Sequence, residues 1–330
     1  MEEGELVIWD GKHMWIWNVP NTNSGDVFAI IDQAKRMGLT GVLVKAHEGQ
    51  LPSGNGGQSK FYEDFLRVLP HLKAAGLKVI AWGYNYFEDP GAEAEMILKV
   101  INAGADGYCF DAEAEMECNP EDGETEEAAA QRRVIKHQQA DQCVKAVREA
   151  RPGFPLMYST FPVIRLHQRF PYKIFDAYCD AFLPQVYWAA IEWLRMEDGS
   201  LVEATPTAVL AEVPKGYSLL GLTKPVAPVG QAYDAATGAE IKEFADLCNS
   251  GGMGYSFWVW EEATPEQIQA ITEIAKPPGS PTTNDSGAGN TDPFTPVSDD
   301  VVAALKAENA ILKAKIAKVQ EALAWKGESS

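Results

Sequence analysis

The sequence has few basic residues, no closely spaced cysteine pair and no long apolar run. Lys and Arg number 28 against 47 Asp and Glu, so the formal net charge is -19. Such a chain repels polyanions, and we expect neither nucleic acid nor a membrane as a partner. No window approaches the roughly 18 apolar residues of a membrane-spanning helix. Residues 1–5 are acidic where a signal peptide is basic, so we expect synthesis in the cytoplasm without a signal peptide.

The cysteine, histidine and glycine patterns exclude further classes of site. Five cysteines without Cys-x-x-Cys spacing indicate reduced thiols, and neither a disulfide framework nor a zinc site. The histidines lack His-x-His and His-Glu-x-x-His spacing, which argues against a metal hydrolase. No phosphate-binding glycine motif follows the first predicted strand, and Ser159 has no nucleophile-elbow pattern. We expect no metal and no cofactor.

Eight short apolar runs of β type recur along the chain, and each is followed by a segment of helical length. The runs are Met14 to Val19, Gly41 to Ala46, Lys78 to Gly83, Gly107 to Glu113, Leu156 to Thr160, Phe182 to Tyr187, Val226 to Gln231 and Tyr255 to Trp260. Gly38, Gly76 and Gly104 are interpreted as helix C-caps. Alternating strands and helices predict a parallel sheet, and eight units favour an α/β fold closed into a (β/α)8 TIM barrel over residues 1–276. An open doubly wound sheet is the alternative.

The last part of the chain has a different composition. Residues 277–297 are rich in Pro, Gly, Ser, Thr, Asn and Asp, which predicts a flexible linker. From Val302 to Leu323 the apolar positions alternate in steps of three and four, which predicts a coiled-coil helix over residues 298–330. We expect this helix to form a homo-oligomer, with a dimer favoured because Asn309 is the lone polar a residue. A single helix docked on its own barrel is the alternative.

The fourth run carries two carboxylates at the end of a strand, where barrel enzymes place their chemistry. Side chains alternate along a strand, so Cys109, Asp111 and Glu113 should share the face that points into the barrel mouth. Two close carboxylates in a partly desolvated site raise one pKa, which keeps one of them protonated for general acid catalysis. The alternative is that Asp111 caps the next helix and Glu113 begins a solvated acidic loop.

This strand resembles the strand-four signature of glycoside hydrolase family 18, the chitinase-like enzymes, whose pattern is D-G-x-D-x-D-x-E. Residues 106–113 match that pattern, except that Cys109 stands where the middle Asp, a partner that tunes the next Asp, belongs. Gln185 to Tyr187 resembles the family's strand six. Gly251 to Trp258 resembles its last strand, which ends in a tryptophan beneath the sugar. Residues 41–49 and 110–113 are also similar to family 25, the lysozyme-like enzymes, which place an Asp where this chain has Asn18.

The family 18 resemblance implies roles for three residues. Glu113 would protonate the glycosidic oxygen, Asp111 would orient the substrate's N-acetyl group, and Tyr187 would hydrogen-bond that group. The N-acetyl carbonyl then attacks the anomeric carbon in place of an enzyme nucleophile. The substrate-binding residues that we expect at the strand ends are Asn18, Trp82, Tyr84, Gln185, Gln231, Trp258 and Trp260. Trp258 and Trp260 share a strand face, so if one points inward both should; the alternative for such tryptophans is packing between barrel and helices.

The sequence therefore predicts a retaining glycosidase that acts on an N-acetylhexosamine-containing polymer, such as peptidoglycan or a chitin-like glycan. A phage lysin or virion-associated hydrolase would reconcile the missing signal peptide with an extracellular substrate. The alternative is a non-catalytic carbohydrate-binding or structural protein, which Cys109 and Asn18 favour, whereas the intact Asp111 and Glu113 favour the enzyme. Lys45 could form a Schiff base, but we expect an ion pair instead.

Overall fold

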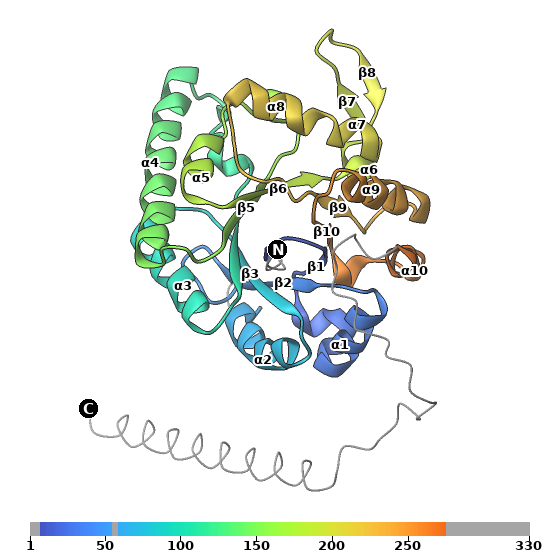
Figure 1. The fold of residues 1–330 in the computed structure, drawn as a ribbon. Coiled ribbons are helices and arrows are strands. Elements are labelled where there is room, and N and C mark those ends of the chain that lie inside the picture. The colour runs from blue at the N-terminus through green and yellow to red at the C-terminus, as the bar shows by residue number, and fades with distance from the viewer. Residues whose placement is uncertain (1–6, 55–58, 275–330) are drawn as a thin grey trace, which may run out of the picture. The chain divides into compact units, whose positions relative to one another are not determined.

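The computed structural model describes residues 7–54 and 59–274, and eight parallel strands within them close into a barrel (Figure 1). The strands pair in the order β1-β10-β9-β6-β5-β4-β3-β2. They are β1 (Lys12–Ile16), β2 (Gly41–Glu48), β3 (Lys78–Tyr84), β4 (Gly107–Asp111), β5 (Leu156–Thr160), β6 (Ala181–Val186), β9 (Val229–Gln231) and β10 (Tyr255–Trp258). Each strand overlaps one of the eight predicted runs, so the TIM barrel is confirmed and the open sheet is excluded.

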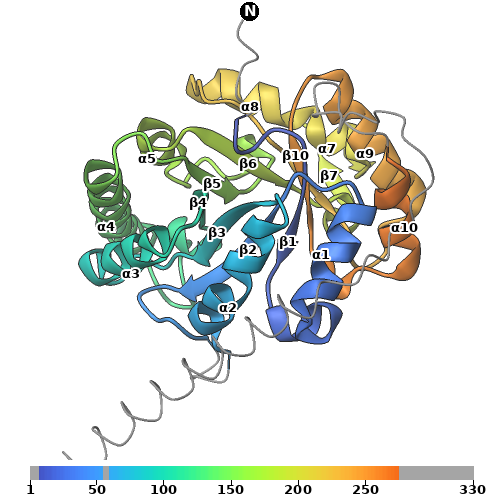
Figure 2. The same cartoon turned by 60° about the horizontal axis from the view of Figure 1, so that its bottom comes forward.

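Helices surround the barrel on its outside, as Figures 1 and 2 show. The longer helices are α1 (Val27–Arg36), α2 (Phe61–Ala74), α3 (Pro90–Asn102), α4 (Glu126–Ala150), α5 (Tyr172–Tyr178), α8 (Glu212–Leu220), α9 (Gly238–Ser250) and α10 (Pro265–Glu273). Gly38, Gly76 and Gly104 follow α1, α2 and α3 with φ values of 65°, 83° and 110°, so the predicted glycine helix ends are confirmed. Positive φ is costly for other residues, which is why glycine stands there.

An insertion that the sequence did not predict separates β6 from β9. It contains α6 (Trp188–Ile191), a hairpin of β7 (Trp193–Arg195) and β8 (Leu201–Glu203), and α7 (Pro206–Leu210), before α8 begins. Figure 1 shows the hairpin projecting away from the barrel. Strands of three residues are too short to show the apolar alternation that identifies longer strands. Short 3-10 segments also occur in the described part of the chain, at η1 (Val19–Gly25), η3 (Ala114–Met116), η4 (Ile164–Leu166) and η5 (Trp260–Glu262).

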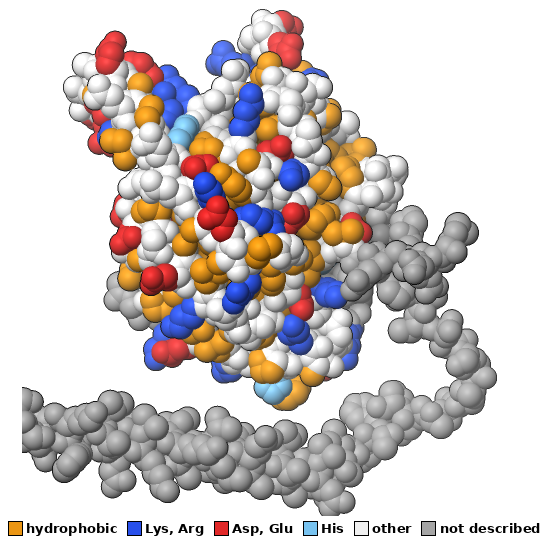
Figure 3. Space-filling view, turned by 60° about the vertical axis from the view of Figure 1, so that its left-hand side comes forward, with side chains coloured by type: hydrophobic (Ala, Val, Ile, Leu, Met, Phe, Trp, Pro, Cys, Tyr) orange, Lys and Arg blue, Asp and Glu red, His pale blue; other side chains and the backbone are white. Residues whose placement is uncertain are grey.

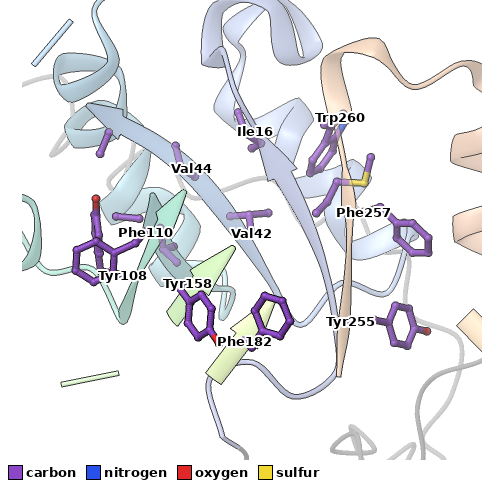
Figure 4. Close-up of a cluster of buried hydrophobic side chains, with 14 of the residues drawn as sticks. Ile16, Val42, Val44, Tyr108, Phe110, Tyr158, Phe182, Tyr255, Phe257 and Trp260 are labelled. Atoms are coloured by element: carbon purple, nitrogen blue, oxygen red, sulfur yellow. The ribbon is translucent and has the colours of Figure 1, made fainter. Parts of the chain in front are cut away.

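The strand side chains form two separate cores. The barrel interior is filled by Trp15, Leu43, Ile80, Trp82, Cys109, Met157, Ala181, Leu183, Ala227 and Val229. The alternate residues face outward and pack beneath the helices, as Tyr108 and Phe110 of β4 do (Figure 4). Because side chains fill the interior, a ligand can meet the strands only at the mouth, where their C-terminal ends lie together.

The remaining observations concern the surface of the barrel, the membrane-spanning helix that was not expected, and the end of the chain. Acidic and basic side chains are interspersed on the face that Figure 3 shows. Among the described residues no helix is both long and apolar enough to cross a membrane. The predicted linker at residues 277–297 and the coiled coil at residues 298–330 lie outside the described residues, so the homo-oligomer stays a prediction.

Candidate active site

A glutamine from β6 joins the two carboxylates at the end of β4. The side-chain amide of Gln185 donates one hydrogen bond to Asp111 Oδ1 at 3.0 Å and another to Glu113 Oε1 at 2.9 Å. Asp111 is the last residue of β4, and Glu113 lies directly before η3. Cys109 faces the barrel interior while Tyr108 faces the helices, so the predicted alternation along β4 is confirmed. We call Asp111 and Glu113 the carboxylate pair.

The surroundings raise the pKa of both members of the carboxylate pair. Burial is the largest cause for each. The charge of Glu113 raises the pKa of Asp111 further, and the charge of Glu115 raises both values. The hydrogen bonds from Gln185 act in the opposite direction, because they stabilise the ionised forms. Two neighbouring buried acids resist joint ionisation, so the pair tends to retain one proton.

A buried polar network holds Asp111 from behind. Asn85 Oδ1 accepts the Asp111 backbone N–H at 3.1 Å, and the Asn85 N–H donates to the Asp111 carbonyl at 2.7 Å. Asn85 Nδ2 also donates to Glu93 Oε1 at 2.7 Å, and Glu93 Oε2 accepts the Phe87 N–H at 2.8 Å. Burial raises the pKa of Glu93 to about 7. The network fixes the backbone of Asp111 against α3, which carries Glu93.

Two tyrosines border the carboxylate pair. Tyr187 directly follows β6, and burial together with the charges of the pair raises its pKa, so its hydroxyl keeps its proton. Its ring meets that of Tyr233 edge-on, with the centroids 5.8 Å apart. Tyr84, the last residue of β3, donates its hydroxyl to Glu115 Oε2 at 2.7 Å. Tyr187 is therefore close to the carboxylate pair, whereas the Tyr84 hydroxyl is engaged by the segment after β4.

Trp258 forms the top of an aromatic cluster in the barrel interior. Its ring centroid lies 5.6 Å from that of Trp15 and 5.3 Å from that of Trp82, with both contacts edge-on. Trp258 is only partly buried, whereas Trp15 and Trp82 are each 1% exposed. The Trp15 indole N–H donates to Ser256 Oγ, and the Trp82 indole N–H donates to the Ile16 carbonyl. Trp258 therefore has ring surface exposed to a ligand, while Trp15 and Trp82 support it from the barrel interior.

The structure corrects three expected substrate contacts. Trp82 lies inside the barrel at 1% exposure and has no surface for a sugar. Trp260 is 3% exposed and packs in the outer core (Figure 4), because β10 ends at Trp258 and the alternation stops there. Gln231 is fully buried, and its Oε1 accepts the N–H groups of Ala189 and Ala190 at 2.9 and 3.3 Å. Gln231 therefore holds the start of α6.

Asn18 lies just beyond β1 and contacts a carboxylate that the sequence analysis missed. Glu261, in η5, accepts the backbone N–H of Asn18 at 2.5 Å and that of Trp17 at 3.3 Å. Burial raises the pKa of Glu261 to about 7. Asn18 Oδ1 is buried and has no hydrogen-bond partner within the described part of the chain. The available signal for Glu261 was its position directly after the last predicted strand.

Lys45 forms an ion pair, as expected, with its Nζ 3.4 Å from Glu48 Oε2. This partner supports the ion-pair interpretation over the Schiff base. The described residues contain no cluster of three or more His, Cys, Asp or Glu arranged to hold a metal ion. The carboxyl, amide and hydroxyl groups at the mouth can take part in proton transfer and hydrogen bonding.

Solved structures of similar fold include several glycoside hydrolases. A glycoside hydrolase family 18 N-acetylglucosaminidase from Paenibacillus barengoltzii has a TM-score of 0.53 and 12% identity, over 80% of this chain and 99% of that chain. A chitinase-like agglutinin from Robinia pseudoacacia has a TM-score of 0.52 and 9% identity, over 80% and 99% of the two chains. A spore cortex-lytic enzyme from Bacillus megaterium has a TM-score of 0.51 and 10% identity, over 80% and 74%.

Sequence comparison alone finds no relative. No family model matches the chain, and no curated protein is significantly similar to it. At identities of 9 to 12% the likeness to solved structures shows the fold alone. The chain has a (β/α)8 barrel fold, which it shares with a family 18 glycoside hydrolase and a chitinase-like agglutinin.

Proposed function

We propose that the protein is a retaining glycosidase acting on an N-acetylhexosamine-containing polymer, such as peptidoglycan or a chitin-like glycan. The observation that carries the proposal is the hydrogen-bonded arrangement of Asp111, Glu113 and Gln185 at the barrel mouth. The partly exposed Trp258 supports it, because the apolar face of a sugar can stack on an indole ring. The neighbours named as an N-acetylglucosaminidase and a cortex-lytic enzyme share the barrel fold. A phage lysin or virion-associated hydrolase stays the predicted setting.

In this proposal each side chain has one task. Glu113 donates a proton to the glycosidic oxygen as the bond to the leaving sugar breaks. Asp111 accepts the N–H of the substrate's N-acetyl group, which turns the acetyl oxygen toward the anomeric carbon. The Tyr187 hydroxyl donates a hydrogen bond to that acetyl oxygen and keeps its proton. The ring that forms is then opened by water, with Glu113 taking a proton from it, and the anomeric configuration is retained.

A second candidate, a non-catalytic carbohydrate-binding protein, is favoured by one observation. Cys109 is fully buried, and burial raises the pKa of its thiol, so a neutral group stands where family 18 has a carboxylate. A chitinase-like agglutinin shares the fold at a similar TM-score, 0.52. Stacking on Trp258 does not depend on the carboxylates, so binding can persist where turnover does not.

The test is incubation with chitin oligomers, peptidoglycan and other bacterial glycans, measuring both released reducing ends and pull-down on the insoluble polymers. Release by the parent protein and its loss in Glu113→Gln would support the glycosidase. Pull-down without release at any pH between about 4 and 8 would support the binding protein instead. Neither release nor pull-down on any of these glycans would overturn both proposals.

A further inference from the structure

A pocket of about 350 Å³ lies at the mouth ends of β1 and β2, and we call it the β1–β2 pocket. Its volume is in the range of small-ligand sites. Its walls include two residues that follow β1, one lysine of β2 and two residues at the start of α2, namely Trp17, Asn18, Lys45, Lys60 and Phe61. Lys45 Nζ lies 5.1 Å from the ring centroid of Trp82, which in turn lies 5.3 Å from that of Trp258. A glycan residue next to a sugar on Trp258 can therefore reach this pocket.

Lys45 contributes a buried ammonium to the pocket wall. Its side chain is 6% exposed, and within the described part of the chain its Nζ donates one hydrogen bond, to Glu48 Oε2 at 3.4 Å. An ammonium has three N–H donors, so two of them have no acceptor among these residues. Burying a donor without an acceptor costs free energy. The Lys45 ammonium therefore has two donors available for a ligand in the pocket.

The charges on the pocket wall favour an anionic ligand. Lys60 also lines the pocket, and its side chain is 65% exposed. The acidic partners of the two lysines, Glu48 and Glu63, do not line the pocket. Asp64 is the only carboxylate among the described lining residues, and Arg67 donates to its Oδ1 at 3.0 Å. The lining carboxylate is thus neutralised, while both lysines present their charge to the pocket.

Aromatic rings make the same pocket suitable for a sugar. Trp17 is 39% exposed, so its indole has free surface on which the apolar face of a sugar ring can stack. The ring centroids of Phe61 and Trp17 lie 4.4 and 5.8 Å from Lys45 Nζ. These rings keep water from the ammonium, so its attraction for an anion is screened less than at the surface. The stacking surface and the cations together fit a sugar that carries an acidic group.

We propose that the β1–β2 pocket is a subsite for a carboxylate-bearing sugar residue, with Lys45 and Lys60 binding the carboxylate and Trp17 stacking on the ring. The inference rests on the proposed function and narrows its substrate to peptidoglycan. N-acetylmuramic acid carries a lactyl carboxyl group, either free or extended by a peptide that has carboxylates of its own, whereas chitin has no carboxyl group. The pocket selects the polymer, and the reaction at the carboxylate pair is the same for either glycan.

The first test compares ligands that differ only in charge, and it uses Glu113→Gln protein so that binding is measured without turnover. The probes are a tetrasaccharide of alternating N-acetylglucosamine and N-acetylmuramic acid with free lactyl carboxylates, and the same tetrasaccharide with carboxamides in their place. Calorimetry should show that the carboxylate form binds at least about tenfold more tightly. Equal affinities, or no binding of either probe, would overturn the inference. This comparison changes no lysine, so it decides even if a lysine variant fails to fold.

The second test assigns the preference to the pocket. Lys45→Met should remove most of the preference for the carboxylate form, and Lys60→Met should reduce it. Lys99→Met is the matched control, because it removes the same charge from a lysine of α3 that lies 4.3 Å from the ring centroid of Tyr62, outside the pocket. The control should keep the preference. A preference that survives both Lys45→Met and Lys60→Met, or that is lost equally in Lys99→Met, would contradict the proposed subsite.

The subsite and the proposed function can fail separately. A preference for the carboxylate form, with no release of reducing ends from any glycan, would refute the glycosidase and leave the subsite in place. Hydrolysis of chitin oligomers together with equal affinity for the two charge forms would refute the subsite and leave the glycosidase in place.

Discussion

Replacing Glu113 by Gln removes the proton that the proposed mechanism needs and leaves the local contacts nearly unchanged. The amide oxygen of the new side chain can still accept the hydrogen bond that Gln185 makes to Glu113 Oε1 at 2.9 Å. It cannot donate a proton to a leaving sugar at neutral pH. General acid catalysis contributes about 10² to 10⁴ in rate, or about 2.7 to 5.4 kcal/mol of activation free energy. We expect kcat to fall by that factor while the glycan still binds.

The assay is release of reducing ends, with binding followed separately by titration calorimetry on the same glycan. Glu115→Gln is the matched control, because Glu115 is exposed and its amide counterpart can still accept the Tyr84 hydroxyl, now at 2.7 Å. That control should keep most of the activity, with the alkaline limb of its pH profile at lower pH, because the charge of Glu115 no longer raises the pKa values of the carboxylate pair. A Glu113→Gln protein with the parent's turnover would show that the acid lies elsewhere in the mouth. An equal loss in both variants would assign the effect to disruption of the segment after β4.

Four further predictions test the binding surface, the family pattern, the buried acids and the tail. Trp258→Ala should weaken glycan binding by about 1 to 3 kcal/mol in calorimetry, and an unchanged affinity would make Trp258 a core residue only. Cys109→Asp should raise the hydrolysis rate if the family 18 mechanism applies, although burying a new carboxylate lowers the melting temperature; Cys109→Asn is its uncharged control. Burial raises the pKa of Glu93 and Glu261 from 4.5 to about 7, so folding binds their protons. The free energy of unfolding that these two protons contribute is fully present below about pH 4.5 and is lost as pH rises through about 7. Urea unfolding should therefore show a loss of up to about 3 kcal/mol per group over that pH range. Light scattering should find that the full-length protein is a dimer and that the protein without residues 298–330 is a monomer. The same oligomeric state for both proteins would contradict the coiled coil.

The barrel could be predicted because its information is local and repeated. Each strand is an apolar run with a helix after it, and glycines such as Gly38 mark where helices end. The ends of the strands were predicted less accurately than the strands themselves. The first strand ends at Ile16, three residues before the predicted end, because Val19 begins η1. The hairpin between β6 and β9 has three-residue strands, and its pairing joins residues whose pattern carries no period.

The sequence predicted which site residues lie on the same face of one strand. It did not predict the contacts that join residues of different strands and loops. Alternation along β4 placed Asp111 and Glu113 together, and Gln185 was found at the end of the sixth strand. Glu261 was missed because its partners are backbone N–H groups of β1's end, which no side-chain motif encodes. Trp260 was placed on the wrong side because alternation was extended past the point where β10 gives way to η5.

Binding and proton transfer rest on different contacts in this mouth. The position of Trp258 depends on two buried indoles, Trp15 and Trp82, which belong to the barrel interior. The charge state of the carboxylate pair depends mainly on burial and on the hydrogen bonds from Gln185 of β6. A substitution can therefore remove the proton without moving the stacking surface. In the proposed function, hydrolysis depends on the electrostatics around Asp111 and Glu113, whereas glycan binding depends on Trp258, and both need the same barrel.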